Sequence, residues 1–312
     1  MSLFSTSVRA NAVRPSSAKG PLRDRFFKGS TPWLFLAVPL LLLATFTLLP
    51  VINMMWYSFT EWNGISKDKE WLGLGNYLEF FTRPELFRVF LVSLYYFFAS
   101  FIQMGLALYF ATILSFNTRF KNLFKGIIFF PYLINGVAIG FTFLYFFRPG
   151  GTLDASLAAL GLEQFQQQWL GNPDIINVSL AGTSVWRYMG LNFVLFLGAI
   201  QSVNPSLYEA SSLDGAGKWQ QFRYIILPSI RPIVGLSVIL AISGSLAVFE
   251  IPYVMTGGAN GSMTFVIQTI NMAFKSHKFG LASAMAVILL LIVIVVTALQ
   301  RKLVPDEKVD LT

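Results

Sequence analysis

Long apolar runs separated by short polar segments make up most of this 312-residue chain. A helix needs about 20 mostly apolar residues to cross the hydrocarbon core of a membrane. Six stretches meet this length, at residues 33–59, 87–115, 126–147, 175–200, 233–254 and 280–299. The sixth has no charged residue, whereas the fourth contains Arg187 and Asn192 and the fifth contains Glu250 near its end. The pattern predicts an all-α membrane protein with six transmembrane helices.

The polar ends of the chain predict three parts. Residues 1–32, with Ser and Pro among basic residues, are expected to form a flexible basic tail. Residues 33–302 are expected to form the six-helix membrane domain, and residues 303–312 a second tail. The apolar run that begins at Trp33 is about twice as long as a signal-peptide core, and no small-residue cleavage site follows it. We therefore expect this run to stay in the mature protein.

Composition supports a membrane location. The chain is 55% hydrophobic and only 12% charged, with a mean hydropathy of +0.62. Average soluble proteins carry about 25% charged residues, so this composition excludes an ordinary soluble enzyme, a disordered protein or a fibre. The chain has no cysteine, which excludes disulfides and thiolate zinc sites.

The positions of Lys and Arg predict the orientation. If the N-terminus is cytoplasmic, fifteen of the 23 basic residues lie in cytoplasmic segments and seven lie in outside loops. Basic residues favour the cytoplasmic side, so both termini are predicted to be cytoplasmic. The net charge of +8 could indicate nucleic acid binding, but the basic residues lie at the edges of the apolar runs. We expect no nucleic acid partner.

Residues for catalysis or metal binding are scarce. The only histidine, His277, lies in a predicted outside loop. The sequence contains no HExxH, no GxSxG and no GxxxxGK[ST] motif, and no carboxylate pair lies within a span. We expect no catalytic residue, no metal site and no ATP hydrolysis by this chain alone.

The loop at residues 204–228, between the fourth and fifth spans, has a distinct pattern. Asn204 is a suitable helix N-cap, and Pro205 suits the first helical position. Gly215 allows a turn, and a second helix is expected to end at Pro228. The loop is therefore predicted to form two short helices joined by glycine at the cytoplasmic face. An ordinary amphipathic interfacial loop is the alternative interpretation.

The spacing in this loop resembles the EAA loop of ABC importer permeases, EAA-x3-G-x9-I-x-L-P. The extended DGA and an aromatic residue resemble the carbohydrate-uptake branch of that family. The matching positions are Glu209, Ala210, Ser211, Asp214, Gly215, Ala216, Phe222, Ile225, Leu227 and Pro228. Ser211 replaces the second alanine of the motif by another small residue.

Segments outside this loop resemble the same branch. They include Trp62-Asn63-Gly64, Gly73-Leu-Gly-Asn76-Tyr77 and Thr256-Gly257-Gly258, and the resemblance runs from about residue 33 to 299. Ala259 and Asn260 replace the Gly-Pro that usually follows the last of these segments.

The resemblance implies a type I ABC importer permease in the cytoplasmic membrane of a bacterium or archaeon. Such a chain forms half of a translocation pathway and couples it to ATP hydrolysis by alternating access. Its implied partners are a second, homologous permease, two ABC ATPase subunits and an extracytoplasmic solute-binding protein. ATP and Mg would bind to the ATPase, and no cofactor to this chain. The implied substrate is a sugar, favoured as a di- or oligosaccharide.

Polar residues inside the spans are candidates for the substrate pathway, because such residues are costly in lipid. Planar polar groups and aromatic rings are suitable for binding sugars. The candidates are Asn135, Trp186, Tyr188, Asn192, Glu250 and Tyr253, with Asn192 and Tyr253 favoured. Alternatively, Arg187 and Glu250 form polar contacts between helices, including a contact with each other.

Two other transport functions remain open. The substrate could be another small polar solute, such as glycerol phosphate or a polyamine, although only Arg187 could meet a phosphate within a span. A secondary transporter would need ionisable groups near mid-membrane, where Glu250 is the sole carboxylate.

Overall fold

The computed structural model describes residues 35–116 and 120–303. The predicted tail at residues 1–32 lies outside the described residues, and so does the predicted tail at residues 303–312 apart from residue 303. The chain divides into two compact units, residues 1–53 and 54–312. The first described helix, Phe35–Tyr57, begins in the first unit and ends in the second. It contains the π turn η1 (Ala44–Leu48) and continues as α2 (Leu49–Tyr57).

A small hairpin opens the second unit. Strand β1 (Thr60–Glu61) pairs antiparallel with β2 (Glu70–Trp71), so the all-α prediction missed two short strands. Helices α3 (Gly75–Thr82) and α4 (Pro84–Arg88) follow. The buried Asn76 amide donates hydrogen bonds of 2.9 Å to the carbonyls of Ser58 and Thr60, which fastens α3 to the hairpin.

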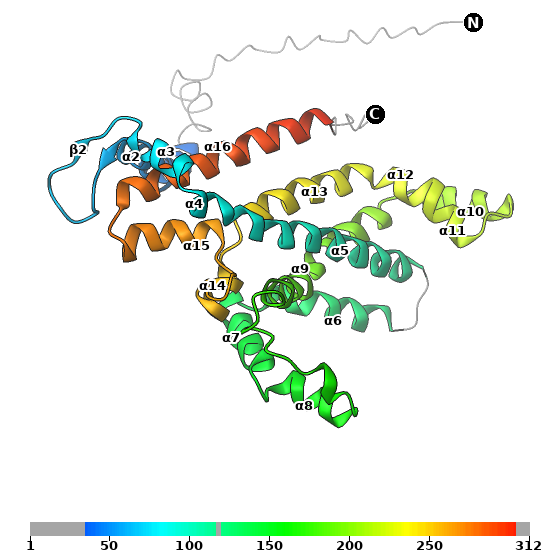
Figure 1. The fold of residues 1–312 in the computed structure, drawn as a ribbon. Coiled ribbons are helices and arrows are strands. Elements are labelled where there is room, and N and C mark those ends of the chain that lie inside the picture. The colour runs from blue at the N-terminus through cyan, green and yellow to red at the C-terminus, as the bar shows by residue number, and fades with distance from the viewer. Residues whose placement is uncertain (1–34, 117–119, 304–312) are drawn as a thin grey trace, which may run out of the picture. The chain divides into compact units, whose positions relative to one another are not determined.

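Two long helices form the centre of this unit. Helix α5 (Phe90–Ser115) lies against α9 (Ile176–Gln201), as Figure 1 shows. Ala99, Ala107 and Ala111 of α5 are buried, and such small side chains let helices approach closely in a membrane. Helix α13 (Arg231–Leu246) packs on α5, and the chain returns through α16 (Phe279–Leu303).

The predicted span at residues 126–147 is wrong as one continuous helix. It is two helices, α6 (Lys121–Leu133) and α7 (Gly136–Phe147), which meet at an angle of 96°. Pro131 removes a backbone donor in the last turn of α6. Asn135 then starts α7, because its side-chain oxygen accepts a hydrogen bond of 2.9 Å from the Val137 amide.

The described residues contain four helices that are long and apolar enough to cross a membrane, or five if the bent α6–α7 pair is one span. Helix α9 occupies the place of the predicted fourth span and has 26 residues. It falls short on apolar character, because Arg187 and Asn192 interrupt its apolar sequence. By length and composition, the described helices therefore do not reach the six spans that the sequence predicts.

Short elements connect the long helices. Helix α8 (Thr152–Ala159) and the 3₁₀ turn η2 (Glu163–Phe165) precede α9, while α14 (Glu250–Thr256), α15 (Phe265–Ile270) and the π turn η4 (Asn271–Lys275) precede α16. Buried Asp154 accepts hydrogen bonds from the Gly150 amide and the Trp169 indole, both 2.9 Å. Asn260, which stands where the resembling family usually has proline, adopts a left-handed backbone, with φ of 53°.

Apolar side chains are buried in separate clusters along the second unit. One contains Ala107, Phe193, Ile226 and Ile230, which come from α5, α9 and the segment leading into α13. Another, around Phe80 and Phe265, joins α3, α4, α15 and α16. The segment after α9 is therefore anchored in the same core as α5 and α9.

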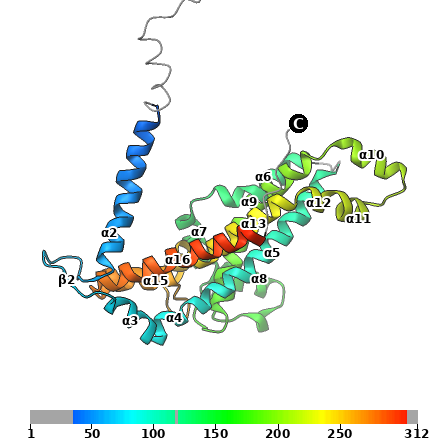
Figure 2. The same cartoon turned by 90° about the horizontal axis from the view of Figure 1, so that it is seen from above.

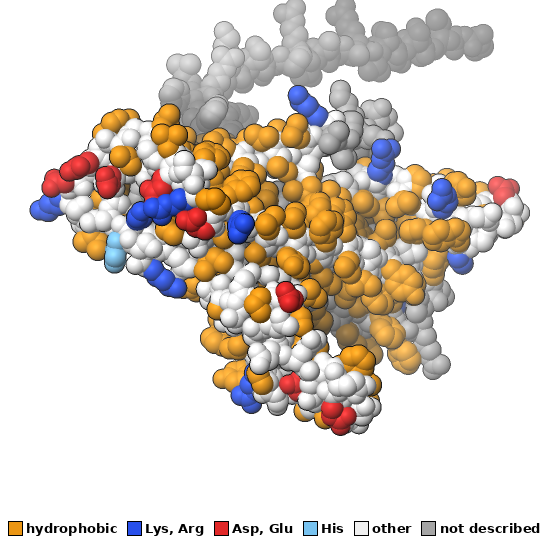
Figure 3. Space-filling view, in the orientation of Figure 1, with side chains coloured by type: hydrophobic (Ala, Val, Ile, Leu, Met, Phe, Trp, Pro, Cys, Tyr) orange, Lys and Arg blue, Asp and Glu red, His pale blue; other side chains and the backbone are white. Residues whose placement is uncertain are grey.

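The two ends of the second unit differ in structure. The hairpin and α3 lie at one end, and the loop after α9 lies at the opposite end, as the views in Figures 1 and 2 agree. Apolar side chains cover the middle of the face drawn in Figure 3, and many of its charged side chains gather at the hairpin end. Such an apolar band is typical of a lipid-facing surface.

Candidate functional site

The loop at residues 204–228 forms the two predicted short helices. Helix α10 (Pro205–Leu213) begins after Asn204, whose side-chain oxygen accepts a 3.0 Å hydrogen bond from the Ser206 amide. The second helical segment consists of α11 (Lys218–Gln221), the π turn η3 (Phe222–Ile226) and α12 (Leu227–Ser229). The predicted helix–glycine–helix form is confirmed, and we call residues 204–228 the coupling loop.

Gly215 makes the turn between the helices. Its φ is 80°, a left-handed conformation that glycine adopts without a steric penalty. The turn is closed by backbone hydrogen bonds from the Asp214, Gly215 and Ala216 amides to carbonyls of α10, at 2.9–3.1 Å. Asp214 is the C-cap residue of α10 and its side chain is exposed.

Gln221 joins the two helices and was not predicted from the sequence. Its side chain is only 2% exposed. The amide nitrogen donates to the hydroxyl oxygens of Ser211 and Ser212, at 3.1 and 3.0 Å. Ser211, the departure from the alanine of the motif, is therefore part of the connection between the helices.

Replacing Gln221 by leucine is expected to weaken the coupling loop. The substitution keeps the side-chain size but removes the donor that reaches both serine hydroxyls, at about 1 kcal/mol per hydrogen bond. The loop should become more susceptible to limited proteolysis in purified protein. Gln201→Leu is the matched control, because Gln201 is exposed at the end of α9 and its side chain makes no hydrogen bond in the described part of the chain. Equal proteolysis rates for the two variants would contradict this role of Gln221.

The second half of the coupling loop is anchored in the core. Ile226 and the following Ile230 are completely buried. The π turn, in which the Leu227 amide bonds to the Phe222 carbonyl, precedes Pro228, which has no amide hydrogen to donate. The segment ends at Ser229, one residue after the predicted stop. Motion of the loop would thus be transmitted directly to α13.

Both helical segments of the coupling loop also present an accessible surface. Glu209 and Ala210 are exposed, as are the large side chains of Leu213, Trp219 and Tyr224. Beside α10 lies a pocket of about 570 Å³, lined by residues that include Glu209 and Tyr208. Burial raises the pKa of the Tyr208 hydroxyl above the ordinary range of a tyrosine. The loop therefore offers a short helix with an apolar tip to a partner.

A second site lies within the helical body, where Arg187 of α9 meets Glu250 of α14. Their atoms Nη1 and Oε2 are 2.6 Å apart. The arginine side chain is 12% exposed and the glutamate side chain 36%. This contact confirms the alternative interpretation that the two charges pair with each other. Arg187 also donates to the Tyr188 hydroxyl, at 3.3 Å.

Next to this pair is a pocket of about 450 Å³ between α5, α9, α13 and α14, which we call the pathway pocket. Its polar lining residues are Tyr96, Ser100, Gln103, Ser184, Tyr188, Asn192, Ser237, Ser245 and Glu250. All are neutral except Glu250, whose charge is matched by Arg187. The pocket can therefore offer hydrogen bonds without presenting an unmatched charge.

Two lining residues have hydroxyl groups without a partner. Tyr96 is 5% exposed and Ser237 is 1% exposed, and neither hydroxyl oxygen has a hydrogen-bond partner in the described part of the chain. A buried polar group without a partner costs free energy, so an unpaired group lining a cavity is suited to binding a ligand. The sequence did not single out these residues, since one hydroxyl in an apolar helix is a weak signal.

The predicted pathway residues divide into two sets. Tyr188, Asn192 and Glu250 line the pathway pocket. The other three lie outside its lining: Asn135 caps α7, Trp186 packs on Phe143 at 5.2 Å, and exposed Tyr253 stacks on Phe249 at 4.8 Å. Tyr253, one of the two favoured candidates, therefore lies behind the lining residue Phe249 and does not line the pocket itself.

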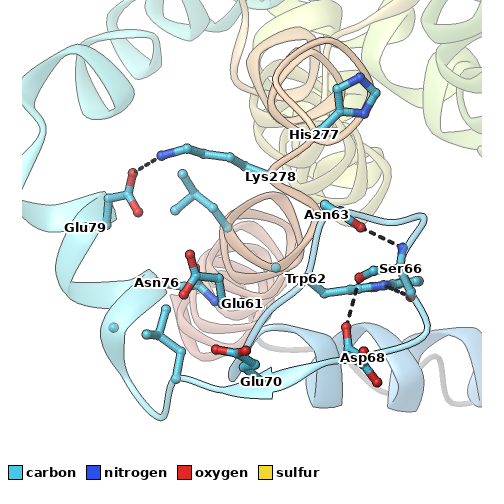
Figure 4. Close-up of a pocket in the computed structure, with 14 residues that line it drawn as sticks. Glu61, Trp62, Asn63, Ser66, Asp68, Glu70, Asn76, Glu79, His277 and Lys278 are labelled. Carbon is cyan, nitrogen blue, oxygen red and sulfur yellow. Dashed lines mark hydrogen bonds and ion pairs between the residues drawn. The ribbon is translucent and has the colours of Figure 1, made fainter.

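The hairpin end contains a further pocket, of about 790 Å³, drawn in Figure 4. Glu61, Asp68 and Glu70 line it, and Lys278 reaches across to Glu79 at 2.9 Å. Most of the lining residues belong to the hairpin and α3, which lie at the opposite end of the unit from the coupling loop (Figure 1).

Comparison with known proteins identifies the family. The family of binding-protein-dependent transport system inner membrane components matches residues 103–309. The chain belongs to this family. It is also 32% identical to the probable ABC transporter permease YurN of Bacillus subtilis, over 87% of this chain and 94% of the relative. The multiple sugar-binding transport permease MsmF of Streptococcus mutans is 30% identical, over 87% and 94%.

Solved structures share the permease fold. A bacterial ABC transporter that imports the acidic polysaccharide alginate matches with a TM-score of 0.75 and 19% identity, over 90% of this chain and 99% of that one. A bacterial alginate transporter in complex with a periplasmic protein bound to an alginate pentasaccharide gives a TM-score of 0.76 and 19% identity, over 89% and 96%. The chain is thus a multi-pass membrane protein with the fold of an ABC importer permease.

Proposed function

We propose that this permease forms half of the pathway of an ATP-driven importer for a neutral di- or oligosaccharide. The pathway pocket is the observation that carries this function. Its hydroxyl and amide groups suit a polyhydroxyl ligand, and two of the hydroxyls lack partners among the described residues. Several relatives are described as permeases for sugars, including lactose and arabinooligosaccharides.

The proposed assembly places the chain six times across the cytoplasmic membrane of a bacterium or archaeon, with both termini inside. A homologous second permease completes the pathway, and a solute-binding protein delivers the sugar from outside. Two ATPase subunits bind ATP and Mg and receive the coupling loop, with Glu209 and the small side chains of Ala210 and Ala216 at the contact. This chain supplies no catalytic group to ATP hydrolysis.

The other transport functions have less support. A phosphate ester would need a free basic group in the pathway, and Arg187 is already paired with Glu250. A proton-coupled carrier would need a carboxylate free to exchange protons, and the single carboxylate of the pathway pocket is held in the same pair.

Removing the unpaired hydroxyls is expected to lower sugar uptake without lowering the stability of the protein. Tyr96→Phe and Ser237→Ala should each lower maximal uptake roughly five- to tenfold. This factor corresponds to the free energy of about one lost hydrogen bond to the sugar. Thermal stability should stay equal or rise, because each variant removes a buried unpaired group. The measurement is ATP-dependent uptake of lactose, maltotriose and diacetylchitobiose into proteoliposomes with the assembled transporter and its binding protein.

Tyr95→Phe is the matched control, since Tyr95 is the exposed neighbour on α5 and lies outside the pathway pocket. Uptake by this variant should equal that of the wild type. Absence of uptake of all three sugars by the wild-type complex would reject the proposed sugar function. Normal uptake by both pocket variants would reject the pocket as the pathway.

A further inference from the structure

We propose that Gly136 is a positioning residue for transport, because its lack of a side chain lets the Arg187–Glu250 pair lie directly over the bend between α6 and α7. This inference rests on the proposed pathway, of which Glu250 lines the pocket. It assigns a role to the bend itself: the bend holds the one carboxylate of the pocket in place.

The first support is steric. A Cβ atom placed on Gly136 would overlap both charged groups, at Glu250 Oε2 and at Arg187 Nη1. The ion pair therefore occupies the space in which any other side chain would begin. Gly136 is buried and is the first residue of α7, so its backbone is helical and needs no glycine for conformational reasons.

The second support is the arrangement of the neighbouring helices. Helix α6 packs on α9, where a Cβ on Gly190 would meet the Ile128 carbonyl at 2.6 Å. Helix α7 packs on α14, where a Cβ on Gly140 would meet Val254 Cγ1 at 2.6 Å. Arg187 belongs to the first pair of helices and Glu250 to the second. The ion pair thus connects the two helix pairs at the point where α6 bends into α7.

The third support is the position of a second break. Glu250 is the first residue of α14, and residues 247–249 separate this helix from α13. Two interrupted spans and the ion pair therefore meet at one joint. Interrupted helices are the places where membrane transporters bend, so the position of Glu250 is tied to the relative orientation of both half-helices.

Gly136→Ala is expected to displace the ion pair without unfolding the protein. Both atoms that meet the new methyl group are the ends of flexible side chains, which can rotate away while the backbone stays in place. We expect maximal ATP-dependent uptake to fall about tenfold per assembled complex. The concentration of binding protein that gives half-maximal uptake should not change, since the outer surface is untouched.

Gly126→Ala is the matched control. Gly126 lies in α6 of the same bent pair and is exposed, and a methyl group added to it would meet no atom within 4 Å outside its own stretch of helix. Its uptake and melting temperature should equal those of the wild type. In Gly136→Ala, the additional change Glu250→Asp shortens the acidic side chain by one methylene and should restore at least half of the lost uptake.

The outcomes separate the two proposals. Wild-type complex that takes up none of the three sugars rejects the proposed sugar function. Wild-type uptake with equal rates for Gly136→Ala and Gly126→Ala rejects the positioning role. Failure of Gly136→Ala to assemble, or a loss of uptake that Glu250→Asp does not relieve, also rejects it, because Gly136 would then serve only the packing of the helices.

Discussion

Replacing Gly215 by valine is expected to reduce ATP-coupled uptake roughly ten- to a hundredfold while the protein stays in the membrane. Apart from its two neighbours in the chain, no described atom lies within 4 Å of a Cβ placed on Gly215, so the substitution causes no clash with the rest of the protein. The effect arises from the backbone, because a β-branched residue at a φ of 80° carries a strain of about 1–3 kcal/mol. The coupling loop would relieve this strain by changing its turn.

A changed turn would misplace α10 relative to α11. The amide of Ala216 would lose its bond to the Ser211 carbonyl, and Ser211 is also a partner of Gln221. A docked helix transmits force only if it is held rigidly to the rest of the permease. We therefore expect ATP hydrolysis by the complex to lose its dependence on the binding protein together with the loss of uptake.

Gly217→Val provides the matched control two residues away. Gly217 has an ordinary extended backbone, with φ of −73° and ψ of 167°, and the nearest atom to its Cβ position is 3.8 Å away. Valine fits this conformation, so uptake should stay within about twofold of the wild type. Equal losses in both variants would mean that side-chain bulk at the docking surface, rather than the turn at Gly215, decides coupling.

The coupling loop could be predicted from the sequence because its structure is determined locally. Asn204, Gly215 and Pro228 each act on the backbone within a few residues, as a cap, a turn and a stop. The cap and the turn lie as expected, and the helix ends one residue after Pro228. The same local chemistry does not reveal Gln221, since its partners lie on the other helix and the residue has no distinctive neighbours in the sequence.

The shape of the membrane helices, in contrast, could not be predicted from the sequence. An apolar run predicts that a segment is buried in lipid but does not predict whether it is straight. Pro131 and Gly136 are both tolerated in continuous membrane helices, so neither marks the bend at residues 134–135. The bend becomes intelligible only with Arg187 and Glu250, which are distant in the sequence from the bend and from each other.

The same distinction applies to the pathway residues. Asn192 and Glu250 could be selected because a strongly polar group in an apolar run is costly without a purpose. Tyr96 and Ser237 are less polar and could not be selected in this way. Tyr253 was favoured for its ring, but that ring is not part of the pocket lining and instead stacks on Phe249, which is. The direction of a side chain on a short helix after a break cannot be derived from helical periodicity.

Replacing Glu250 by leucine is expected to destabilise the permease by more than the roughly 0–1 kcal/mol of a surface pair and by at most about 3–5 kcal/mol, the cost of breaking a fully buried pair, because Arg187 is 12% and Glu250 36% exposed. The remaining Arg187 guanidinium would lose its carboxylate partner while only 12% exposed within the helical body. The melting temperature of the detergent-solubilised protein should fall accordingly. Arg187→Leu should cost less, because the Glu250 carboxylate that it leaves unpaired is 36% exposed and so less desolvated than the Arg187 guanidinium.

The double variant Arg187→Leu/Glu250→Leu should recover most of the lost stability, since two apolar side chains replace the pair without leaving a charge. It should not recover uptake, because the carboxylate of the pathway pocket is missing. Glu79→Leu is the control for the loss of a carboxylate, because its partners Lys278 and Arg83 are 44% and 43% exposed, and pairs with such exposed cations contribute about 0–1 kcal/mol. A single Glu250→Leu variant as stable as Glu79→Leu would show that the Arg187–Glu250 pair does not hold the joint between the helices.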